Sequence, residues 1–343
     1  MIKAAIVGLG WWGKTQVEAV QGSDKIKFVA GTTRSLSDEA LDFMKEYNIE
    51  PKQSYEEILA DPNIDAVVLV TPNSQHVSQT LAAVAAGKHV FCEKPFSLDG
   101  AGAQQSVDAA AAAGLTLGVG YSRRFHPEMT ALREKIKNGD LGTILHIEAT
   151  MTFPNALYLK PGAWRADTSE TPCGGLTPMG VHAIDGMIDL VGEIDEVYCQ
   201  SFRRAIDVEA DDTTSILFRM KDGCSGYLGT MTATGGGFNF QVYGSKGFIK
   251  LEGMTHIAGA PSEERRMKLF STCTFKPVKG PAEVWAAAEF DVVQAALEAF
   301  ADSALGGTPY LIEPDEMVHG SAVTEAVVKS ATEHRVVKLE EIS

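Results

Sequence analysis

Gly8-Leu9-Gly10-Trp11-Trp12-Gly13 directly follows a short apolar run, Ile2–Val7, and precedes a helical pattern, Lys14–Gln21. Glycines at the first, third and sixth positions of such a turn allow a tight bend, close approach of the backbone to a pyrophosphate, and close packing of helix against strand. The N-terminus of the following helix presents unpaired N–H groups and a partial positive charge to phosphates. The segment therefore predicts a dinucleotide-binding turn.

Short apolar runs and helical patterns alternate over roughly the first third of the chain, which is typical of an α/β fold with a doubly wound parallel sheet. Ser54-Tyr55-Glu56-Glu57 has the capping-box spacing and is expected to open a helix. Gly114 is expected to end another helix in the left-handed conformation. The expected strands are Ile2–Val7, Ile26–Ala30, Ala66–Val70, His89–Cys92 and Leu115–Gly120.

After Tyr121 the pattern changes to longer alternating strands, which predicts an α+β region with a mostly antiparallel sheet. Helices are expected at Pro127–Asn138, Val284–Ala301 and Glu316–Thr332. The expected strands are Ile144–Phe153, Val197–Arg203, Thr213–Met220, Gly226–Thr232, Asn239–Tyr243 and Gly247–Leu251. We therefore expect a Rossmann domain over residues 1–124 and a second domain over residues 125–343.

The composition excludes several classes of protein. At 343 residues, with 45 % apolar and 22 % charged residues, the chain is long enough for two globular domains and is not of a disordered type. A net charge of −15 disfavours binding to nucleic acid. No apolar run reaches the roughly 18 to 20 residues that cross a bilayer, so no membrane association is expected. The five cysteines are scattered without a CxxC pair, which favours a reducing cytoplasm over a disulfide framework or a zinc site.

The choice of cofactor is indicated twenty residues after the last glycine of the turn. An NAD-preferring fold places a carboxylate there for the ribose 2′-hydroxyl, whereas this chain has Thr33 followed by Arg34. A guanidinium and hydroxyls can hold a 2′-phosphate, so the pattern favours NADP over NAD. The alternative is that Arg34 stacks on the adenine and that both cofactors are used.

Two further segments follow expected parallel strands, where ligands bind in open α/β sheets. The first is Thr71-Pro72-Asn73-Ser74-Gln75-His76, and the second is Glu93-Lys94-Pro95. The Lys94 ammonium can hydrogen-bond a substrate hydroxyl and favour its alkoxide character. The residues expected at the cofactor in these segments are Thr71, Pro72, Asn73, His76, Glu93 and Lys94.

In the second half, a glycine-rich segment beginning at Cys173 leads into a helical pattern that carries His182 and Asp185. These two residues are three apart and so lie on one face of one helical turn. Histidine is the side chain best suited to take or give a proton near neutral pH, which makes His182 a candidate general acid/base. A metal site is not expected because a third ligand is not spaced nearby.

With these segments in order, the chain resembles the Gfo/Idh/MocA family, which includes glucose–fructose oxidoreductase and inositol dehydrogenase. The resemblance extends over nearly the whole chain. It rests on the order and spacing of the N-terminal glycine turn, Thr71-Pro72 with His76, Glu93-Lys94-Pro95, Tyr121-Ser122-Arg123-Arg124-Phe125, Trp164-Arg165, and Gly174-Gly175 through His182 and Asp185.

The resemblance implies a Rossmann domain followed by an α+β domain whose large open sheet forms homodimers or homotetramers. It also implies hydride transfer between a nicotinamide and a carbon that bears a hydroxyl or carbonyl, in a sugar, cyclitol or related compound. By the same resemblance, Lys94 orients the reacting oxygen and His182 is the general acid/base. The residues that it implies for substrate binding are Arg123, Trp164, Arg165 and Asp185.

One position departs from the family pattern. Dehydrogenases of this family often have an aspartate four residues before the histidine, and here that position is Pro178, which cannot accept a proton. His182 then acts with Lys94 alone, or another group replaces the carboxylate, or the substrate differs from the usual polyols. Asp185 lies on the other side of His182 in sequence and is not assumed to be equivalent.

The sequence leaves two alternatives to a dehydrogenase or reductase open. A glycosidase of the same family retains its nicotinamide and cleaves by transient oxidation, and a tightly held cofactor without net turnover would identify it. A catalytically silent sugar or nucleotide sensor is the other alternative, and the missing aspartate is the observation that raises it.

Overall fold

The computed structural model describes residues 1–254 and 261–342. The chain forms two compact units. The first contains Met1–Ser122 together with Asp291–Val318, and the second contains Arg123–Phe290 and the chain from His319 onward. None of the helices in the described residues is long and apolar enough to cross a membrane.

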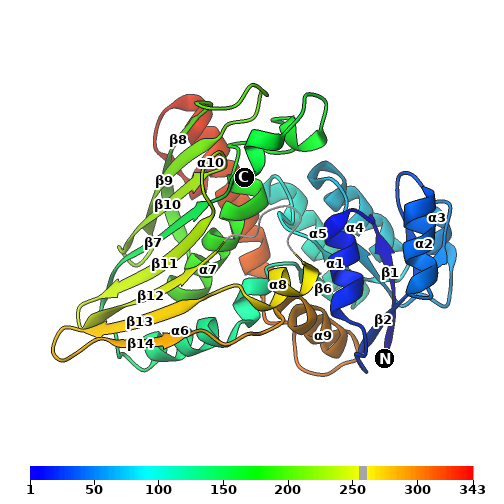
Figure 1. The fold of residues 1–343 in the computed structure, drawn as a ribbon, viewed down its shortest axis with the longest axis horizontal. Coiled ribbons are helices and arrows are strands. Elements are labelled where there is room, and N and C mark those ends of the chain that lie inside the picture. The colour runs from blue at the N-terminus through cyan, green and yellow to red at the C-terminus, as the bar shows by residue number, and fades with distance from the viewer. Residues whose placement is uncertain (255–260, 343) are drawn as a thin grey trace. The chain divides into compact units, whose positions relative to one another are not determined.

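A six-stranded parallel sheet forms the centre of the first unit (Figure 1). The strand order is β3-β2-β1-β4-β5-β6, which is the Rossmann order and confirms the expected doubly wound sheet. The strands are β1 (Ile2–Val7), β2 (Ile26–Thr32), β3 (Glu50–Pro51), β4 (Ala66–Leu69), β5 (His89–Cys92) and β6 (Leu117–Val119). The helices between them are α1 (Trp11–Ala19), α2 (Asp38–Glu46), α3 (Tyr55–Ala60), α4 (His76–Ala85) and α5 (Gly100–Ala113).

The central strands of this sheet are buried on both faces. All four residues of β4 are fully buried, as are Ala4, Ala5 and Ile6 of β1. A strand covered by helices on both sides has no solvent face, and this explains why these segments read as continuous apolar runs. The direction in which the chain adds strands reverses between β1 and β4. In open α/β sheets, ligands bind at the carboxyl ends of the strands where such a reversal occurs.

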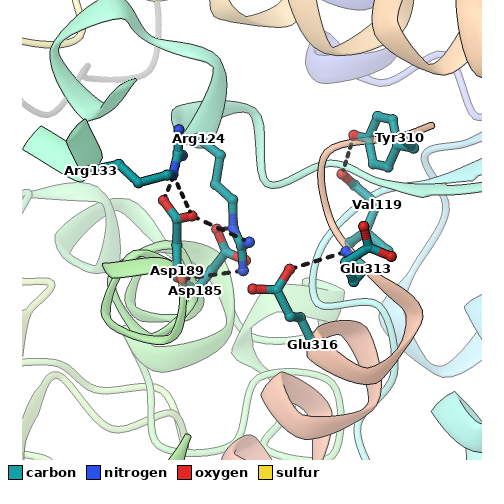
Figure 2. Close-up of polar contacts among 8 residues, drawn as sticks. All are labelled: Val119, Arg124, Arg133, Asp185, Asp189, Tyr310, Glu313 and Glu316. Atoms are coloured by element: carbon teal, nitrogen blue, oxygen red, sulfur yellow. Dashed lines mark hydrogen bonds and ion pairs between the residues drawn. The ribbon is translucent and has the colours of Figure 1, made fainter. Parts of the chain in front are cut away.

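A late segment completes the first unit. Helix α9 (Val292–Ala304) places the Phe300 ring 5.6 Å from that of Phe91 in β5. The Tyr310 hydroxyl donates a hydrogen bond of 2.8 Å to the carbonyl of Val119 in β6 (Figure 2). The first unit therefore contains residues far beyond the expected 1–124. The reason is that Phe300 and Tyr310 contact β5 and β6, the two strands at one edge of its sheet.

The expected helix over Val284–Ala301 is wrong in its first part. Glu283–Ala286 forms β14, which pairs antiparallel with β13 (Thr272–Pro277), and the helix begins only at Val292. Asp291 is the N-cap of that helix and accepts hydrogen bonds from two backbone N–H groups. Backbone pairing with β13 overrides the helical propensity of the alanine-rich segment, as tertiary context often does.

The second unit is built on a nine-stranded sheet in the order β14-β13-β12-β11-β7-β10-β9-β8-β15. Its pairs are antiparallel except for β7 with β10, which run parallel, so the expected mostly antiparallel sheet is confirmed. The remaining strands are β7 (Ile144–Thr152), β8 (Ile194–Phe202), β9 (Thr213–Met220), β10 (Ser225–Met231), β11 (Gly237–Gly244), β12 (Gly247–Gly253) and β15 (Val337–Lys338).

Helices cover one face of this sheet (Figure 1). Gly186 of α7 comes so close to the Phe240 ring of β11 that an added Cβ would lie 3.3 Å from it. Cys199 of β8 donates its backbone N–H to the hydroxyl of Ser330 in α10 at 2.9 Å. The helices of this unit are α6 (Pro127–Lys137), α7 (Val181–Val191), α8 (Ser262–Met267) and the C-terminal part of α10 (Pro314–Glu333).

Candidate active site

The glycine turn between β1 and α1 has the geometry of a turn that only glycines permit. Gly8 has φ of +103°, and an added Cβ would lie 2.4 Å from the carbonyl oxygen of Val70. A Cβ on Gly13 would lie 2.0 Å from the carbonyl oxygen of Gly8. Both glycines are therefore required for the backbone to close. The carbonyl of Gly10 accepts from the N–H of Lys14, which starts the helix.

Gly10 differs from the other two glycines of the turn. It has an ordinary extended backbone, with φ of −66°, and among the described residues no heavy atom lies within 4 Å of the position of a Cβ. As the N-cap of α1 it has no side chain to cap the helix, and the first turn of α1 contains no acidic residue. The helix N-terminus is thus open to an anion, which its N–H groups and partial positive charge attract. Leu9 is buried, whereas Trp11 is half exposed.

The other expected cofactor residues follow neighbouring strands of the same sheet. Thr33 and Arg34 come after β2, and Arg34 is exposed. Thr71 and Pro72 come after β4 and lead into a 3₁₀ turn at Asn73–Gln75. Because parallel strands end at the same edge of a sheet, these residues share the carboxyl edge with the glycine turn. Glu93 and Lys94 follow β5 at this edge too.

Glu93 is a buried carboxylate directly beside the partly exposed Lys94. It accepts a hydrogen bond from the side-chain amide of Gln16 in α1 and one of 3.2 Å from the backbone N–H of Lys94. Burial raises the pKa of Glu93, and the adjacent Lys94 and the hydrogen bond from Gln16 oppose this shift. The Glu93 side chain therefore joins the first helix of the unit to the strand end that carries Lys94.

His76 lies at the start of α4 and is fully buried. Its Nδ1 is 2.7 Å from the carbonyl oxygen of Pro95, and its Nε2 is 3.1 Å from that of Thr71. The Lys94–Pro95 peptide bond is cis. The imidazole thus connects the segment that follows β4 with the segment that follows β5, and it holds the backbone next to Lys94.

In the second unit, an irregular turn precedes the helix that carries His182. Leu176–Gly180 form a π-helical turn in which the N–H of Gly180 donates to the carbonyl of Gly175, five residues back. Pro178 lies within this turn, and α7 starts one residue after it ends. π turns are rare and frequently accompany functional sites. His182, on the first turn of α7, is buried.

Asp185 belongs to a buried network of charged side chains (Figure 2). The Nε of Arg124 lies 3.0 Å from each carboxylate oxygen of Asp185, and its Nη2 lies 2.8 Å from Oδ1. One helical turn further on, Asp189 pairs with Arg133 at 2.7 Å and lies 3.6 Å from Nη1 of Arg124. Removing one partner from a buried ion pair costs about 3 to 5 kcal/mol, because the other charge stays buried without compensation.

The remaining expected substrate residues lie elsewhere in the second unit. The guanidinium of Arg123 is 4.6 Å from the centre of the Phe238 ring, and burial lowers the pKa of Arg123. An arginine has so high an ordinary pKa that it stays charged near neutral pH. Arg165 stacks on Trp164 at 4.2 Å within a short 3₁₀ turn, Trp164–Ala166. In residues 1–254 and 261–342, no group of three His, Cys, Asp or Glu side chains could hold a metal ion.

Sequence reasoning did not assign a role to Arg124, Arg133, Asp189 or Gln16. Asp189 has the clearest signal, since it continues the spacing of His182 and Asp185 on the same face of α7. Gln16 and Arg124 bind carboxylates that are 77 and 61 residues away in the chain. Pairings over such separations are set by the tertiary fold.

Two family profiles match the chain. Residues 2–121 match the oxidoreductase family with an NAD-binding Rossmann fold, and residues 129–250 match the GFO/IDH/MocA C-terminal domain. The matched regions correspond to the six-stranded sheet of the first unit and to most of the nine-stranded sheet of the second.

Relatives of known sequence and structure agree with these profiles. Myo-inositol 2-dehydrogenase from Thermotoga maritima is 26 % identical over 99 % of both chains. 1,5-Anhydro-D-fructose reductase from Ensifer adhaerens is 39 % identical over 38 % of this chain and 39 % of its own. A crystal structure from Desulfitobacterium hafniense, provisionally described as an NADPH-dependent oxidoreductase, has a TM-score of 0.90 at 27 % identity and covers 99 % of this chain and 98 % of its own. The chain belongs to the GFO/IDH/MocA family of oxidoreductases.

Proposed function

We propose that this oxidoreductase transfers a hydride between a nicotinamide dinucleotide and the CH–OH or C=O carbon of a sugar, cyclitol or related polyol. The observation that carries the proposal is the carboxyl edge of the parallel sheet. There the glycine turn, Thr33–Arg34, Thr71–Asn73 and Glu93–Lys94 follow four different strands of one unit. A nucleotide site and a candidate catalytic lysine thus share one edge, which is where open α/β sheets bind ligands.

The first unit fits a dinucleotide at its glycine turn. The space beside Gly10 that a Cβ would fill is open, and the uncapped end of α1 faces it. When bound, the nicotinamide supplies the hydride acceptor for alcohol oxidation or the hydride donor for carbonyl reduction. Thr71, Pro72, Asn73 and Glu93 stay assigned to this site in our proposal, with His76 as the residue that holds the backbone between them.

We propose that NADP is favoured over NAD. Thr33 and Arg34 stand where an NAD-preferring fold has a carboxylate, and the exposed Arg34 guanidinium can bind a 2′-phosphate through charge-assisted hydrogen bonds.

Lys94 and His182 carry the proposed proton chemistry. The Lys94 ammonium donates a hydrogen bond to the reacting oxygen, which stabilises negative charge on it when the carbon loses or gains hydride. His182 takes the hydroxyl proton in oxidation and returns it in reduction. Pro178 occupies the position of the usual family aspartate, and its side chain can neither take nor give a proton. His182 therefore works without a carboxylate at that position.

The names of the relatives support a sugar-like substrate. One oxidises a cyclitol and another reduces an anhydro sugar, as their names state. Arg123, Trp164 and Arg165 offer donors and an aromatic face, which suit a polyhydroxylated ligand. We also propose a cytoplasmic location, which rests on the five scattered cysteines, and a homodimer or homotetramer formed through the open face of the nine-stranded sheet.

The direct test is a panel of sugars, cyclitols and sugar acids assayed at the absorbance band of reduced nicotinamide, with each cofactor. We expect net turnover with at least one polyol, and a loss of about 10² to 10⁴ in kcat for Lys94→Ala on that substrate. Lys27→Ala removes an exposed lysine of β2 and serves as the matched control. Full activity of Lys94→Ala would contradict the assigned role, and a tightly held cofactor without net turnover would contradict the dehydrogenase function itself.

A further inference from the structure

We infer that Arg124 is a positioning residue that acts through helix α7. By binding the carboxylate of Asp185 it fixes the helical turn that presents His182, and it holds that carboxylate away from substrate. The inference rests on the acid/base role proposed for His182. It assigns to Asp185 a part in holding the helix in place of direct contact with substrate hydroxyls.

The contact between Arg124 and Asp185 involves both the side chain and the main chain. Nε of Arg124 donates to both carboxylate oxygens at 3.0 Å, and Nη2 donates to the backbone carbonyl of Asp185 at 3.4 Å. Only 2 % of the Arg124 side chain and 5 % of the Asp185 side chain are exposed. A planar, multiply bonded guanidinium fixes orientation as well as distance. Arg124 therefore constrains the helix itself and not merely one of its side chains.

A second anchor lies one turn further along α7. Asp189 accepts two hydrogen bonds from Arg133 of α6, at 2.9 and 2.7 Å, and also faces Nη1 of Arg124 at 3.6 Å (Figure 2). The two arginines balance the two aspartates in charge. Arg124 thus spans two successive turns of α7, and Arg133 ties the second of them to the neighbouring helix.

The start of α7 needs such an anchor because regular helix does not precede it. His182 is the second residue after the π turn at Leu176–Gly180, and Gly174, which precedes that turn, has a positive φ of +52°. His182, Asp185 and Asp189 share one face of the helix. Fixing the second and third turns therefore fixes the imidazole on the first. A displacement of about 1 Å in a group that takes part in chemistry can lower a rate by about 10²-fold.

The test compares Arg124→Met, Asp185→Asn and the double variant in steady-state kinetics on a substrate found in the panel. We expect each single variant to lower kcat at least tenfold, with KM within about threefold of the wild type. The double variant should be no slower than the slower single variant, because both changes act on the same contact between Arg124 and Asp185. Arg335→Met is the matched control, because Arg335 forms exposed ion pairs with Glu333 and Glu341 near the C-terminus of the chain.

Chemical rescue separates positioning from a general loss of stability. Free guanidinium should restore part of the kcat of Arg124→Ala, because it can occupy the vacated space beside Asp185. The same ion should restore none of the activity of His182→Gln. Far-UV circular dichroism and nicotinamide binding report whether each variant is folded. If Arg124→Met does not fold, the kinetics of Asp185→Asn test the positioning role, because asparagine preserves the volume of the side chain and removes the charge that pairs with Arg124.

The outcomes for the inference and for the proposed function are distinct. A fully active His182→Gln overturns the acid/base assignment and, with it, the inference. A slow His182→Gln beside wild-type kinetics for Arg124→Met and Asp185→Asn overturns the inference alone, as does a rise in KM without loss of kcat for Asp185→Asn. If the wild type turns over no substrate, amide hydrogen exchange tests whether Arg124 anchors α7. Equal exchange rates in Val181–Val191 of the wild type and of Arg124→Met contradict the anchoring.

Discussion

At the residue scale, the central feature of the first unit is a buried carboxylate next to a candidate catalytic lysine. Glu93 accepts from Gln16 of α1 and from the backbone N–H of Lys94, so it fixes the start of the segment that carries the lysine. A Cβ added to Gly120 would lie 2.7 Å from its Oε1, which shows how closely the backbone packs around it. The sequence pattern places Glu93 at the cofactor, and its contacts add a role in placing Lys94.

The raised pKa of Glu93 leads to a prediction about stability and pH. A carboxyl group whose pKa is higher in the native state than its ordinary 4.5 binds a proton more tightly when the protein is folded. Its contribution to the free energy of unfolding is therefore present at low pH and is lost as the pH rises through the native pKa. We expect Glu93→Gln, which is neutral throughout, to gain stability relative to the wild type as the pH rises from 4.5, in urea unfolding curves recorded over that range.

An exposed carboxylate supplies the control for that measurement. The hydrogen bond and ion pair with Lys14 lower the pKa of Glu39, so its stabilising contribution is present above its ordinary pKa and is lost as the pH falls. Glu39→Gln should thus show the opposite slope, small because the pair is exposed. A Glu93→Gln curve parallel to that of the wild type would mean that Lys94 and Gln16 fully offset the cost of burial.

At the element scale, the turn between β1 and α1 separates glycines needed for the fold from a glycine needed for the ligand. Gly13 cannot carry a Cβ without moving the backbone of Gly8, whereas Gly10 can carry one in open space and with an ordinary φ. The sequence motif by itself does not distinguish between its three glycines. The structure distinguishes them by what surrounds each one.

Gly10→Ala and Gly13→Ala are therefore expected to differ. Gly13→Ala should lower the free energy of unfolding by about 3 kcal/mol, because its Cβ overlaps backbone that cannot yield. Gly10→Ala should change stability by less than about 1 kcal/mol and yet weaken NADPH binding at least tenfold, because its methyl group occupies the space proposed for the pyrophosphate. Thermal unfolding and titrations of NADPH and NADH followed by Trp11 and Trp12 fluorescence check both.

Two results would contradict this division of roles. Unchanged NADPH affinity in Gly10→Ala would place the pyrophosphate elsewhere. NADH binding that is many-fold tighter than NADPH binding in the wild type would contradict the cofactor preference drawn from Thr33 and Arg34.

At the scale of the whole molecule, the face of the nine-stranded sheet opposite its helices carries apolar side chains. Leu217 of β9 is 54 % exposed, and it is paired with Tyr198 on one neighbouring strand and with Tyr227 on the other. Phe202 at the end of β8 is 50 % exposed. Exposed apolar groups that gather on one face are typical of surfaces that bind another protein.

If this face joins copies of the chain, Leu217→Lys should shift the protein from dimer or tetramer toward monomer, since it buries a charge in each copy of the interface. Light scattering coupled to gel filtration measures the mass. Leu305→Lys, at the end of α9 in the first unit, changes an equally exposed leucine and should leave the mass unchanged. A wild type that is monomeric at all concentrations, or a Leu217→Lys variant that still assembles, would contradict this assembly surface.

Much of the local structure was predictable because its causes are local. The strands Ile2–Val7 and His89–Cys92 were predicted to the residue, since continuous apolar runs between turn signals leave little choice of boundary. Ser54 accepts from the N–H of Glu57 as its spacing predicts, and Gly114 has the left-handed φ of +64°. At these two helix ends, the hydrogen bonds that decide the conformation close within a few residues.

By itself, the sequence determined the doubly wound sheet, the glycine turn, the open sheet of the second half and the family to which they belong, because periodicity, turn chemistry and motif order are properties of neighbours in the chain. Only the tertiary structure decided that Glu283–Ala286 is a strand, that α9 belongs to the first unit, and that Asp185 faces Arg124. The reason is that strand pairing, ring packing and buried ion pairs join residues far apart in sequence. Their free energies outweigh local propensity wherever the two compete.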